Sequence, residues 1–430
     1  MNHPNILYIH SHDTGRYVQP YGHAIPTPNI QRLAEQGVLF RQAFCAGPTC
    51  SPSRASLLTG QCAHSSGVIG LAHRGFSLKD YKQHILHTLR KVGYHSALSG
   101  VQHIARNAEI IGYDQVLTAQ GGKAASTAVD FLSDAPPQPF FLSVGFGVTH
   151  RKFPEPGPAE DARYCLPPAP LPDTPETRRD MAAFKASARI LDRNIGDVLE
   201  ALDKNSLAED TLVICTTDHG IAFPGMKCNL TDHGIGVMLV MRGPGGFSGG
   251  QVCDAMVSHI DIFPTICDLL EIEPPQWLQG NSMMPLIRGE ADEINDEIFS
   301  EVTYHAAYEP QRAVRTCRWK YIRRFDERQG PVLPNCDDST SKDVWLRHGW
   351  RERTVPQEQL YDLIFDRNET CNLVADAAMT EVLDEMRARL ERWMCATDDP
   401  LLKGPVPAPS GARFNDPDGL SPSEEPLVAP

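Results

Sequence analysis

The chain has 430 residues, of which 41% are hydrophobic and 22% charged, and its formal net charge is −14 at pH 7. This composition is typical of a globular protein with one large domain and a smaller one. The negative charge argues against a nucleic-acid partner. The sequence holds no apolar run near the roughly 18 residues that a membrane helix needs, which argues against a membrane partner.

The net charge restricts the kind of substrate, and the cysteines indicate the cellular compartment. The overall field repels anions, so an anionic substrate has to be small or attacked at its end, in a locally basic pocket. The 12 cysteines include no Cys-x-x-Cys pair and suit reduced thiols better than a disulfide framework. Met1 leads directly into a strand-like segment, without a basic and apolar leader. We therefore expect a cytoplasmic protein.

Short apolar segments alternate with amphipathic ones through residues 1–290. Strands are predicted at 5–9, 38–44, 94–99, 139–148, 211–217 and 237–241, and helices at 29–35, 84–92, 124–132, 178–202 and 259–270. This alternation indicates a parallel sheet that helices cover on both faces. We predict an α/β fold with a large mixed, mainly parallel sheet sandwiched by helices.

The pattern changes after about residue 290. A strand at 312–323, another at 359–365 and an amphipathic helix at 377–395 predict a smaller α+β domain over residues 291–400. Residues 401–430 are rich in proline, serine, glycine and acidic residues. That composition is typical of a disordered tail or of a loosely attached strap.

Polar side chains follow four of the predicted strands. His12 and Asp13 come after the first strand, His103 and His150 after later ones, and the pair Asp218-His219 after the strand at 211–217. Ligands bind beyond the carboxyl ends of parallel strands. One aspartate at a strand end more often caps a turn, but two matched strand ends favour a metal site.

The stretch from Cys50 to Gly60 predicts a helix start with a cysteine just ahead of it. Ser51 can cap this helix, Pro52 suits its first position and Gly60 can end it. A helix N-terminus attracts anions, and Arg54 can reach back toward Cys50. A nucleophile beside an anion cradle and a fixed cation suits attack on a tetrahedral oxyanion ester. The alternative is a buried, inert thiol.

This stretch, Cys-x-Pro-x-Arg followed by Leu-Thr-Gly, resembles the signature of the type I sulfatases of the alkaline phosphatase superfamily. The resemblance covers roughly residues 4–400. It implies that a formylglycine-generating enzyme oxidises Cys50 to formylglycine, whose hydrated aldehyde attacks the sulfur. Strings around Asp218, Lys227, His150 and Trp393 are most similar to those of the heparan N-sulfatases, the N-sulfoglucosamine sulfohydrolases.

The resemblance also implies a metal site. Asp13, Asp218 and His219, with His12, would hold one divalent ion, which is calcium in the family. The first-strand motif of sulfatases is usually a pair of aspartates, so His12 departs from the pattern. Two imidazoles favour manganese or another transition metal over calcium. Metal identity stays open, and His12 is either a ligand or a neighbour of one.

Other roles are carried over residue by residue. Arg54 and Lys227 would bind the sulfate oxygens, and His150 or His103 would protonate the leaving group. The family has Lys-x-His where this chain has Val101-Gln102-His103, so one cation is missing. Arg151 would contact a substrate carboxylate or a second sulfate, and His305 would line the pocket.

Three functions follow from these residues. The first is hydrolysis of a sulfate ester or sulfamate on a small or terminal sulfated sugar. The second is hydrolysis of a phosphonate or phosphate ester on the same scaffold, because Asp-His metal pairs occur in those relatives. The third is a non-catalytic binding protein with a degenerate site, which His12 and Val101 suggest.

Overall fold

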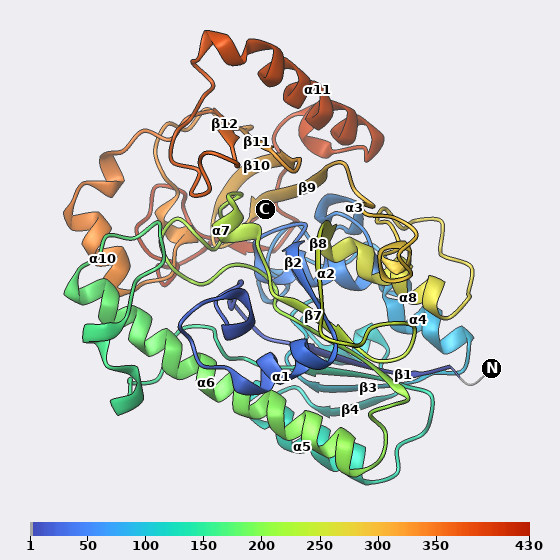
Figure 1. Ribbon diagram of the computed structural model, residues 1–430. Coiled ribbons are helices and arrows are strands. Elements are labelled where there is room, and N and C mark those ends of the chain that lie inside the picture. The colour runs from blue at the N-terminus through green and yellow to red at the C-terminus, as the bar shows by residue number, and fades with distance from the viewer. Residues whose placement is uncertain (1–2) are drawn as a thin grey trace.

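A central sheet of eight strands organises the computed structural model, which describes residues 3–430 (Figure 1). The strands lie in the order β4-β3-β5-β1-β6-β7-β2-β8. Their bounds are β1 (Asn5–His10), β2 (Val38–Phe44), β3 (His95–Gly100), β4 (Gln115–Thr118), β5 (Phe140–Gly145), β6 (Thr211–Thr216), β7 (Leu239–Arg242) and β8 (Gln251–Ser258). Only β7 runs antiparallel to its neighbours within this sheet. The predicted mixed, mainly parallel sheet is confirmed.

Both faces of the sheet are buried. On β1, Ile6 and Tyr8 belong to one apolar core, and Leu7 and Ile9 belong to the other. The first core is covered by α2 (Cys50–Thr59), α4 (Ile85–Lys91) and α8 (Ile262–Leu269), and the second by α1 (Pro28–Gln36), α5 (Ala124–Ser133) and α6 (Pro175–Lys204). Burial on both faces explains why the central strands β1, β5 and β6 are mainly apolar along their whole length.

Two strands of this sheet escaped the sequence-based prediction. Both β4 and β8 lie at an edge of the sheet, and the first two residues of each strand are exposed. An edge strand has fewer buried positions than a central one, so its sequence carries a weaker apolar signal.

A second, antiparallel sheet of four strands follows in the order β12-β11-β10-β9. Its strands are β9 (Ile298–Tyr304), β10 (Tyr308–Arg315), β11 (Trp319–Arg324) and β12 (Glu358–Asp362). The helix α11 (Thr380–Ala396) packs on one face through Leu383, Met386 and Leu390. The opposite face joins the first core of the large sheet through Val302, Ala313 and Ile322. The smaller α+β region is thus confirmed, while the domain boundaries remain a prediction.

The single strand predicted at 312–323 was wrong. This segment forms the hairpin of β10 and β11, which turns at residues 316–318. The turn contains Thr316, Cys317 and Arg318 instead of glycine or proline, so it lacks the usual sequence signal. The short helices α3 (Ala63–Ser66), α7 (Asp232–Ile235), α9 (Met284–Ile287) and α10 (Thr340–Arg347) were not predicted either. None of the helices in residues 3–430 is long and apolar enough to cross a membrane.

The last residues follow the surface of the protein as a strap. Short strands β13 (Arg413–Phe414) and β14 (Leu427–Val428) pair with each other, and Ala412 and Asn415 are fully buried. Of the two alternatives for residues 401–430, the structure therefore describes the packed strap and not the disordered tail. A composition rich in proline and acidic residues did not prevent packing, because two small side chains fit against the rest of the chain.

Candidate active site

The polar residues at the strand ends meet at one edge of the large sheet. Asp13 follows β1 and Asp218 follows β6, and these two strands are direct neighbours. The backbone N–H of Asp13 donates a hydrogen bond of 2.8 Å to Asp218 Oδ1. Ligand atoms of His12, Asp13, Cys50 and Asp218 all lie within 4.8 Å of one another, and all four residues are buried. The predicted convergence of distant segments is therefore observed.

Cys50 is the first residue of α2, at the end of the helix that faces this cluster. Its Sγ lies 3.4 Å from Nε2 of His219. The expected cap at Ser51 was wrong, because the helix begins one residue before it and Thr49 occupies the cap position without a side-chain hydrogen bond. Gly60 ends the helix in the left-handed region, at φ 66°, as predicted.

Arg54 lies one turn into α2 and extends its guanidinium to Asp218 and the end of β1. Its Nη2 donates to Asp218 Oδ2 at 2.9 Å and to the carbonyl of Ser11 at 2.8 Å. Its Nη1 contacts the ring of His10, a buried residue that sequence reasoning passed over. Asp218 belongs to the same group of ligand atoms as Cys50, so the reach of Arg54 toward Cys50 stays a prediction. Arg54 holds the Asp218 carboxylate in place.

Burial and charge set the protonation of this cluster. Burial lowers the pKa of His12 to about 4, although Asp218 and Asp13 raise it. Burial raises the pKa of the Asp13 carboxyl, but the positive charge of Lys227 outweighs burial and holds this pKa well below its usual range. The pKa of Asp218 is lowered in the same way, by His219 and Arg54 against burial. The cluster therefore combines ionised carboxylates with a neutral imidazole, which is the state that binds metal ions.

The residues around the cluster fit a divalent cation. Nδ1 of His12 lies 2.8 Å from Asp13 Oδ1 and 3.2 Å from Asp218 Oδ2. Nε2 of His219 lies 3.3 Å from Asp13 Oδ1. Oxygen and imidazole donors therefore converge on one small buried volume, as in sites for divalent ions.

Lys227 spans two carboxylates. Its Nζ lies 3.0 Å from Asp13 Oδ2 and 3.0 Å from Asp337 Oδ2. Burial lowers the pKa of Lys227, but the charges of Asp13 and Asp337 raise it well above its usual value. Asp337 was missed, because it follows no strand of the large sheet and belongs to no recognisable motif. Only its position beside Lys227 reveals it.

Three further histidines surround the cluster. The ring centroids of His103 and His150 lie 5.0 and 4.5 Å from that of His12. The side chain of His150 is 37% exposed, and its Nε2 lies 3.9 Å from Asp13 Oδ2. His305 is buried, and the charge of Lys227 adds to burial in lowering its pKa well below the usual range. All three predicted histidines thus lie around the Cys50 cluster.

The backbone is strained at the same place. Asp13, His103 and Cys228, the residue after Lys227, have φ values of 56°, 59° and 65°. Residues other than glycine seldom adopt this left-handed conformation, which costs on the order of 1 kcal/mol or more and tends to occur at functional sites. The strain supports the assignment of this edge of the sheet as the functional site.

Arg151 has a different environment from the one expected. It forms a two-pronged salt bridge with Asp180 of α6, with N–O distances of 2.7 and 2.8 Å, and donates from Nε to the carbonyl of Ala222. Its guanidinium also lies 4.4 and 4.7 Å from the ring centroids of Phe153 and Phe223. These contacts give Arg151 a packing role, and the predicted substrate contact gains no support from them.

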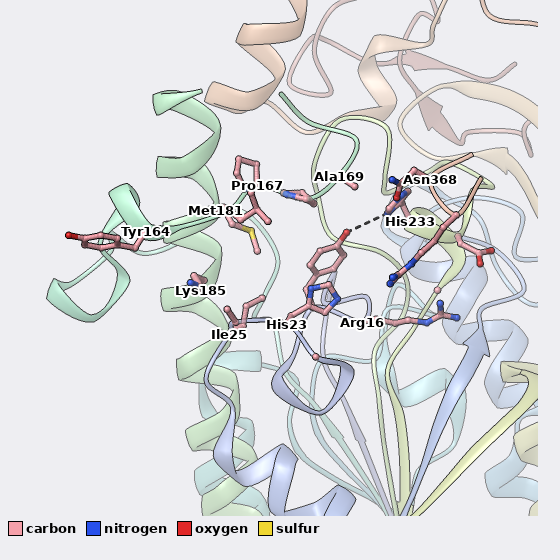
Figure 2. Close-up of a pocket in the computed structure, with 18 residues that line it drawn as sticks. Arg16, His23, Ile25, Tyr164, Pro167, Ala169, Met181, Lys185, His233 and Asn368 are labelled. Atoms are coloured by element: carbon pink, nitrogen blue, oxygen red, sulfur yellow. Dashed lines mark hydrogen bonds between the residues drawn. The ribbon is translucent and has the colours of Figure 1, made fainter. Parts of the chain in front are cut away.

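The protein also has a separate cavity of about 560 Å³ (Figure 2). Its first lining residue in the chain is Arg16, three positions after Asp13. Its walls include Arg16, His23, Tyr164, Lys185 and His233, and it contains none of the predicted site residues. The dashed line in Figure 2 joins the Tyr17 hydroxyl to His233 Nδ1, at 3.5 Å. The reactive cluster is therefore distinct from this cavity.

Comparison with known families identifies the class of protein. The sulfatase family model matches residues 4–272, and a model of the N-sulphoglucosamine sulphohydrolase C-terminal region matches residues 226–334. The chain belongs to the sulfatase family, and it is an enzyme that hydrolyses sulfuric esters or sulfamates.

The similarity extends over most of the length of the relatives. Human N-sulphoglucosamine sulphohydrolase is 29% identical over 98% of this chain and 95% of its own. An ulvan-active sulfatase of Formosa agariphila is 27% identical over 95% of this chain and 84% of its own.

Two solved structures share the fold. A sulfatase from Bacteroides thetaiotaomicron superposes with a TM-score of 0.74 at 21% identity, over 98% of this chain and 99% of the other. A second structure, in complex with its substrate D-glucosamine-2-N,6-O-disulfate, gives a TM-score of 0.73 at 18% identity, over 94% of this chain and 99% of the other.

Proposed function

We propose that this enzyme removes sulfate from a small or terminal sulfated sugar, with formylglycine at position 50 and one divalent metal ion. The observation that carries the proposal is the convergence of Cys50 with His12, Asp13 and Asp218 within 4.8 Å at the start of α2. The names of the relatives support a sugar sulfate, and N-sulfated glucosamine is the substrate we favour.

The protonation of the Cys50 thiol argues against the unmodified side chain as the nucleophile. Burial raises the pKa of the Cys50 thiol well above its usual value, although Lys227 opposes this effect. An unmodified thiol here is protonated at neutral pH and is a weak nucleophile. Conversion to formylglycine by a generating enzyme supplies a hydroxyl nucleophile in its place.

Asp13, Asp218 and His12 would hold the metal ion, with His219 beside them. When bound, the ion neutralises charge on the sulfate oxygens and favours ionisation of nearby hydroxyl groups. Calcium is the ion of the family, and the imidazole of His12 favours manganese or another transition metal.

The remaining side chains bind the sulfate and move protons. Lys227 carries a buried positive charge beside Asp13, where it would stabilise the negative oxygens of the reacting sulfate. Arg54 holds the Asp218 carboxylate beside the first turn of α2. His150 is the partly exposed imidazole and would protonate the leaving oxygen or nitrogen. His103 is half-buried, and desolvation holds its pKa well below the usual value, so it is neutral and would accept a proton when sulfate is released.

Two further side chains are proposed to contact the substrate. His305 lies beside Lys227 and would line the pocket. Arg151 would contact a substrate carboxylate or a second sulfate after giving up its salt bridge with Asp180.

Turnover by the purified enzyme tests this proposal. The substrates are N-sulfoglucosamine, an O-sulfated glucosamine and an aryl phosphodiester, each with the Cys50→Ala variant as control. Mass spectrometry of the peptide that contains position 50 reports the modification. Turnover of a sulfated sugar together with a formylglycine mass supports the proposal, and an unmodified thiol without turnover overturns it in favour of a binding protein.

A second candidate is hydrolysis of a phosphate or phosphonate ester. It is favoured by the position of His12, whose Nδ1 lies 3.2 Å from Asp218 Oδ2, because imidazole and carboxylate donors together suit transition metals. Faster turnover of the phosphodiester than of either sulfated sugar would establish this second function.

A further inference from the structure

Asp337 brings a second carboxylate to the ammonium group of Lys227. Its Oδ2 lies 3.0 Å from Lys227 Nζ, and its side chain is 18% exposed, whereas the side chain of Asp13 on the other side of Lys227 is fully buried. Among residues 3–430, the Asp337 carboxylate forms an ion pair with Lys227 alone and accepts no side-chain hydrogen bond. It is therefore the carboxylate of this group that a substrate can reach.

The loop that carries Asp337 is held from both sides. Before it, Oδ1 of Asn335 accepts a hydrogen bond of 2.8 Å from the backbone N–H of Ala307, between β9 and β10. After it, Nζ of Lys342 in α10 donates to the carbonyl of Cys336 at 2.8 Å. A carboxylate on a braced loop keeps its position when a ligand binds, which suits a role in recognition.

The charge of Asp337 has to be offset by the substrate. Burial raises the pKa of Asp337, but the positive charge of Lys227 outweighs burial and lowers this pKa, so the carboxylate is ionised at neutral pH. Lys227 already shares its single charge with Asp13, at 3.0 Å. A sulfate bound at Lys227 is repelled by an ionised carboxylate beside it. A hydrogen-bond donor next to the sulfate removes this cost, because an ionised carboxylate only accepts hydrogen bonds.

Sulfamates and sulfate esters differ in this donor. The bridging nitrogen of a sulfamate carries an N–H, whereas the bridging oxygen of an ester carries no hydrogen. Hydrolysis of a sulfamate breaks the S–N bond. The oxygen of water goes to the sulfur and both protons of water go to the nitrogen, so the products are sulfate and an ammonium group. Hydrolysis of an ester releases a neutral hydroxyl instead, so a carboxylate beside the sulfate favours the amine.

We propose that Asp337 recognises the nitrogen of an amino-sugar sulfamate: its carboxylate accepts a hydrogen bond from the sulfamate N–H and pairs with the ammonium group of the released amino sugar. This inference rests on the proposed function and narrows the substrate class from sulfated sugars to N-sulfated ones. The distances permit it, because a sulfate oxygen bound to Lys227 Nζ lies about 3 Å from that atom, as Asp337 Oδ2 does. The nitrogen is bonded to the same sulfur as that oxygen.

Binding of the product amine tests the assignment without turnover. Calorimetry on metal-loaded Cys50→Ala protein, in excess inorganic sulfate, compares glucosamine, which is cationic, with N-acetylglucosamine, which is neutral. Asp337→Asn is expected to weaken glucosamine binding about 10-fold and N-acetylglucosamine binding less than about 2-fold. Asp337→Glu is expected to restore part of the loss. The affinity for inorganic sulfate alone is expected to hold or to rise, because a negative charge leaves the pocket.

Asp338→Asn is the matched control. Asp338 is the next residue of the same loop, its side chain is 51% exposed, and it pairs with Lys342. This variant is expected to change neither sugar affinity. The inference is overturned if Asp337→Asn binds glucosamine as tightly as its parent, if both sugars lose affinity equally, or if the parent binds no glucosamine. A loss of sulfate affinity as large as the loss of glucosamine affinity also overturns it, and assigns Asp337 to holding Lys227.

Kinetics keep this inference distinct from the proposed function. With N-sulfoglucosamine, Asp337→Asn is expected to lower kcat/KM about 10-fold, and with N-acetylglucosamine 6-O-sulfate less than about 2-fold. If the wild-type enzyme turns over neither sugar but glucosamine binding depends on Asp337, the proposed reaction fails and the amine site stands. If the wild-type enzyme hydrolyses N-sulfoglucosamine and Asp337→Asn keeps the same kcat/KM, the reaction stands and the amine site fails.

Discussion

Two buried charge clusters in this protein look alike in composition but differ in state. One is the group at the end of the large sheet, and the other joins Cys62, His64 and Glu301 between the two sheets. Each brings a cysteine, a histidine and a carboxylate within 4.8 Å, and each lies near a buried arginine. We call them the catalytic cluster and the interface cluster.

The interface cluster is closed by ion pairs. Glu301 lies 2.9 Å from His64 Nδ1 and 3.2 Å from Arg312 Nη2, and Arg312 also binds Asp399 with both prongs. Burial lowers the pKa of His64, but Glu301 outweighs burial and raises it to about 10. A protonated imidazole cannot bind a metal ion, so this cluster is a salt-bridge network.

In the catalytic cluster, the carboxylates are not all neutralised by cations of the protein. Its imidazole at His12 is neutral, and Asp13, Asp218 and Asp337 outnumber the two cations Arg54 and Lys227. Excess negative charge in a buried place calls for a cation. The comparison shows that the same side-chain types form an open, negatively charged group or a closed network of ion pairs, according to which partners arrive from elsewhere in the chain.

The largest expected effect separates the two buried cysteines. Cys50→Ala is expected to lower kcat by about 10⁴-fold or more, because the nucleophile is lost. Cys62 also lies beside an imidazole, with Sγ 3.5 Å from His64 Nε2. Cys62→Ala is expected to change kcat by less than about 2-fold if the comparison is right, and steady-state kinetics on a sulfated sugar measures both.

Arg312→Met tests the interface cluster. It leaves Glu301 and Asp399 buried without their cation, so we expect a loss of about 3–5 kcal/mol in the free energy of unfolding. Arg389→Met, which breaks a partly exposed pair with Glu297, is expected to cost about 1 kcal/mol or less. Urea denaturation compares them, and equal losses would contradict the assigned burial of the network.

Lys227→Met tests the role of the buried positive charge in the catalytic cluster. Loss of the ammonium beside Asp13 is expected to lower kcat/KM by about 10²–10³-fold, because the sulfate oxygens lose a fixed charge. Lys320→Met removes another buried lysine, which pairs with Asp232 and Glu369. This control is expected to reduce stability while the folded enzyme keeps its kcat, and a comparable fall in kcat would remove the special role of Lys227.

The two clusters predict opposite effects of pH on stability. The pKa of His64 is raised to about 10, so its contribution is complete below pH 6.5 and is lost as the pH rises toward 10. The pKa of His12 is lowered to about 4, so its contribution is complete above pH 6.5 and is lost as the pH falls toward 4.

Each of these two contributions to the free energy of unfolding amounts to at most a few kcal/mol. Unfolding midpoints of the metal-free protein from pH 4 to 10 measure them. His64→Gln is expected to remove the alkaline slope alone and His12→Gln the acidic one alone. A slope that persists in its own variant rejects the protonation state assigned to that residue.

The smallest effect concerns metal choice. His12→Asp replaces an imidazole by a carboxylate and is expected to shift the preference between manganese and calcium by about 10-fold toward calcium. Metal titrations followed by calorimetry measure the ratio. The His64→Gln protein serves as control, and an unchanged ratio in His12→Asp would remove His12 from the metal site.

Much of the fold was predictable because its signals are local. The apolar runs at 38–44 and 211–217 are strands close to these bounds, and Gly60 ends α2 at the predicted residue. The convergence of Asp13 and Asp218 was also predictable, because parallel strands end at the same edge of a sheet. Local pattern and sheet topology together were enough to locate the site.

Other features depended on contacts between distant segments. Arg151 follows a strand as its neighbours at the site do, yet Asp180 of α6 pairs with it. Asp337 lies beside Lys227, and Ala412 of the strap lies against Gly75, although neither carries a sequence signal. Side-chain partners 29 to 337 positions apart in the chain have no periodicity that reasoning from one sequence could detect.

The amino-acid order alone therefore specified the α/β class, a helix beside Cys50 that ends at Gly60, and the group of acidic and imidazole side chains at the strand ends. The protonation states of these side chains were decided only by the tertiary structure. Whether an imidazole is neutral, as His12 is, or protonated, as His64 is, depends on burial and on the charges packed around it. Both quantities are set by segments far away in the chain, because electrostatic interactions act through space and not along the sequence.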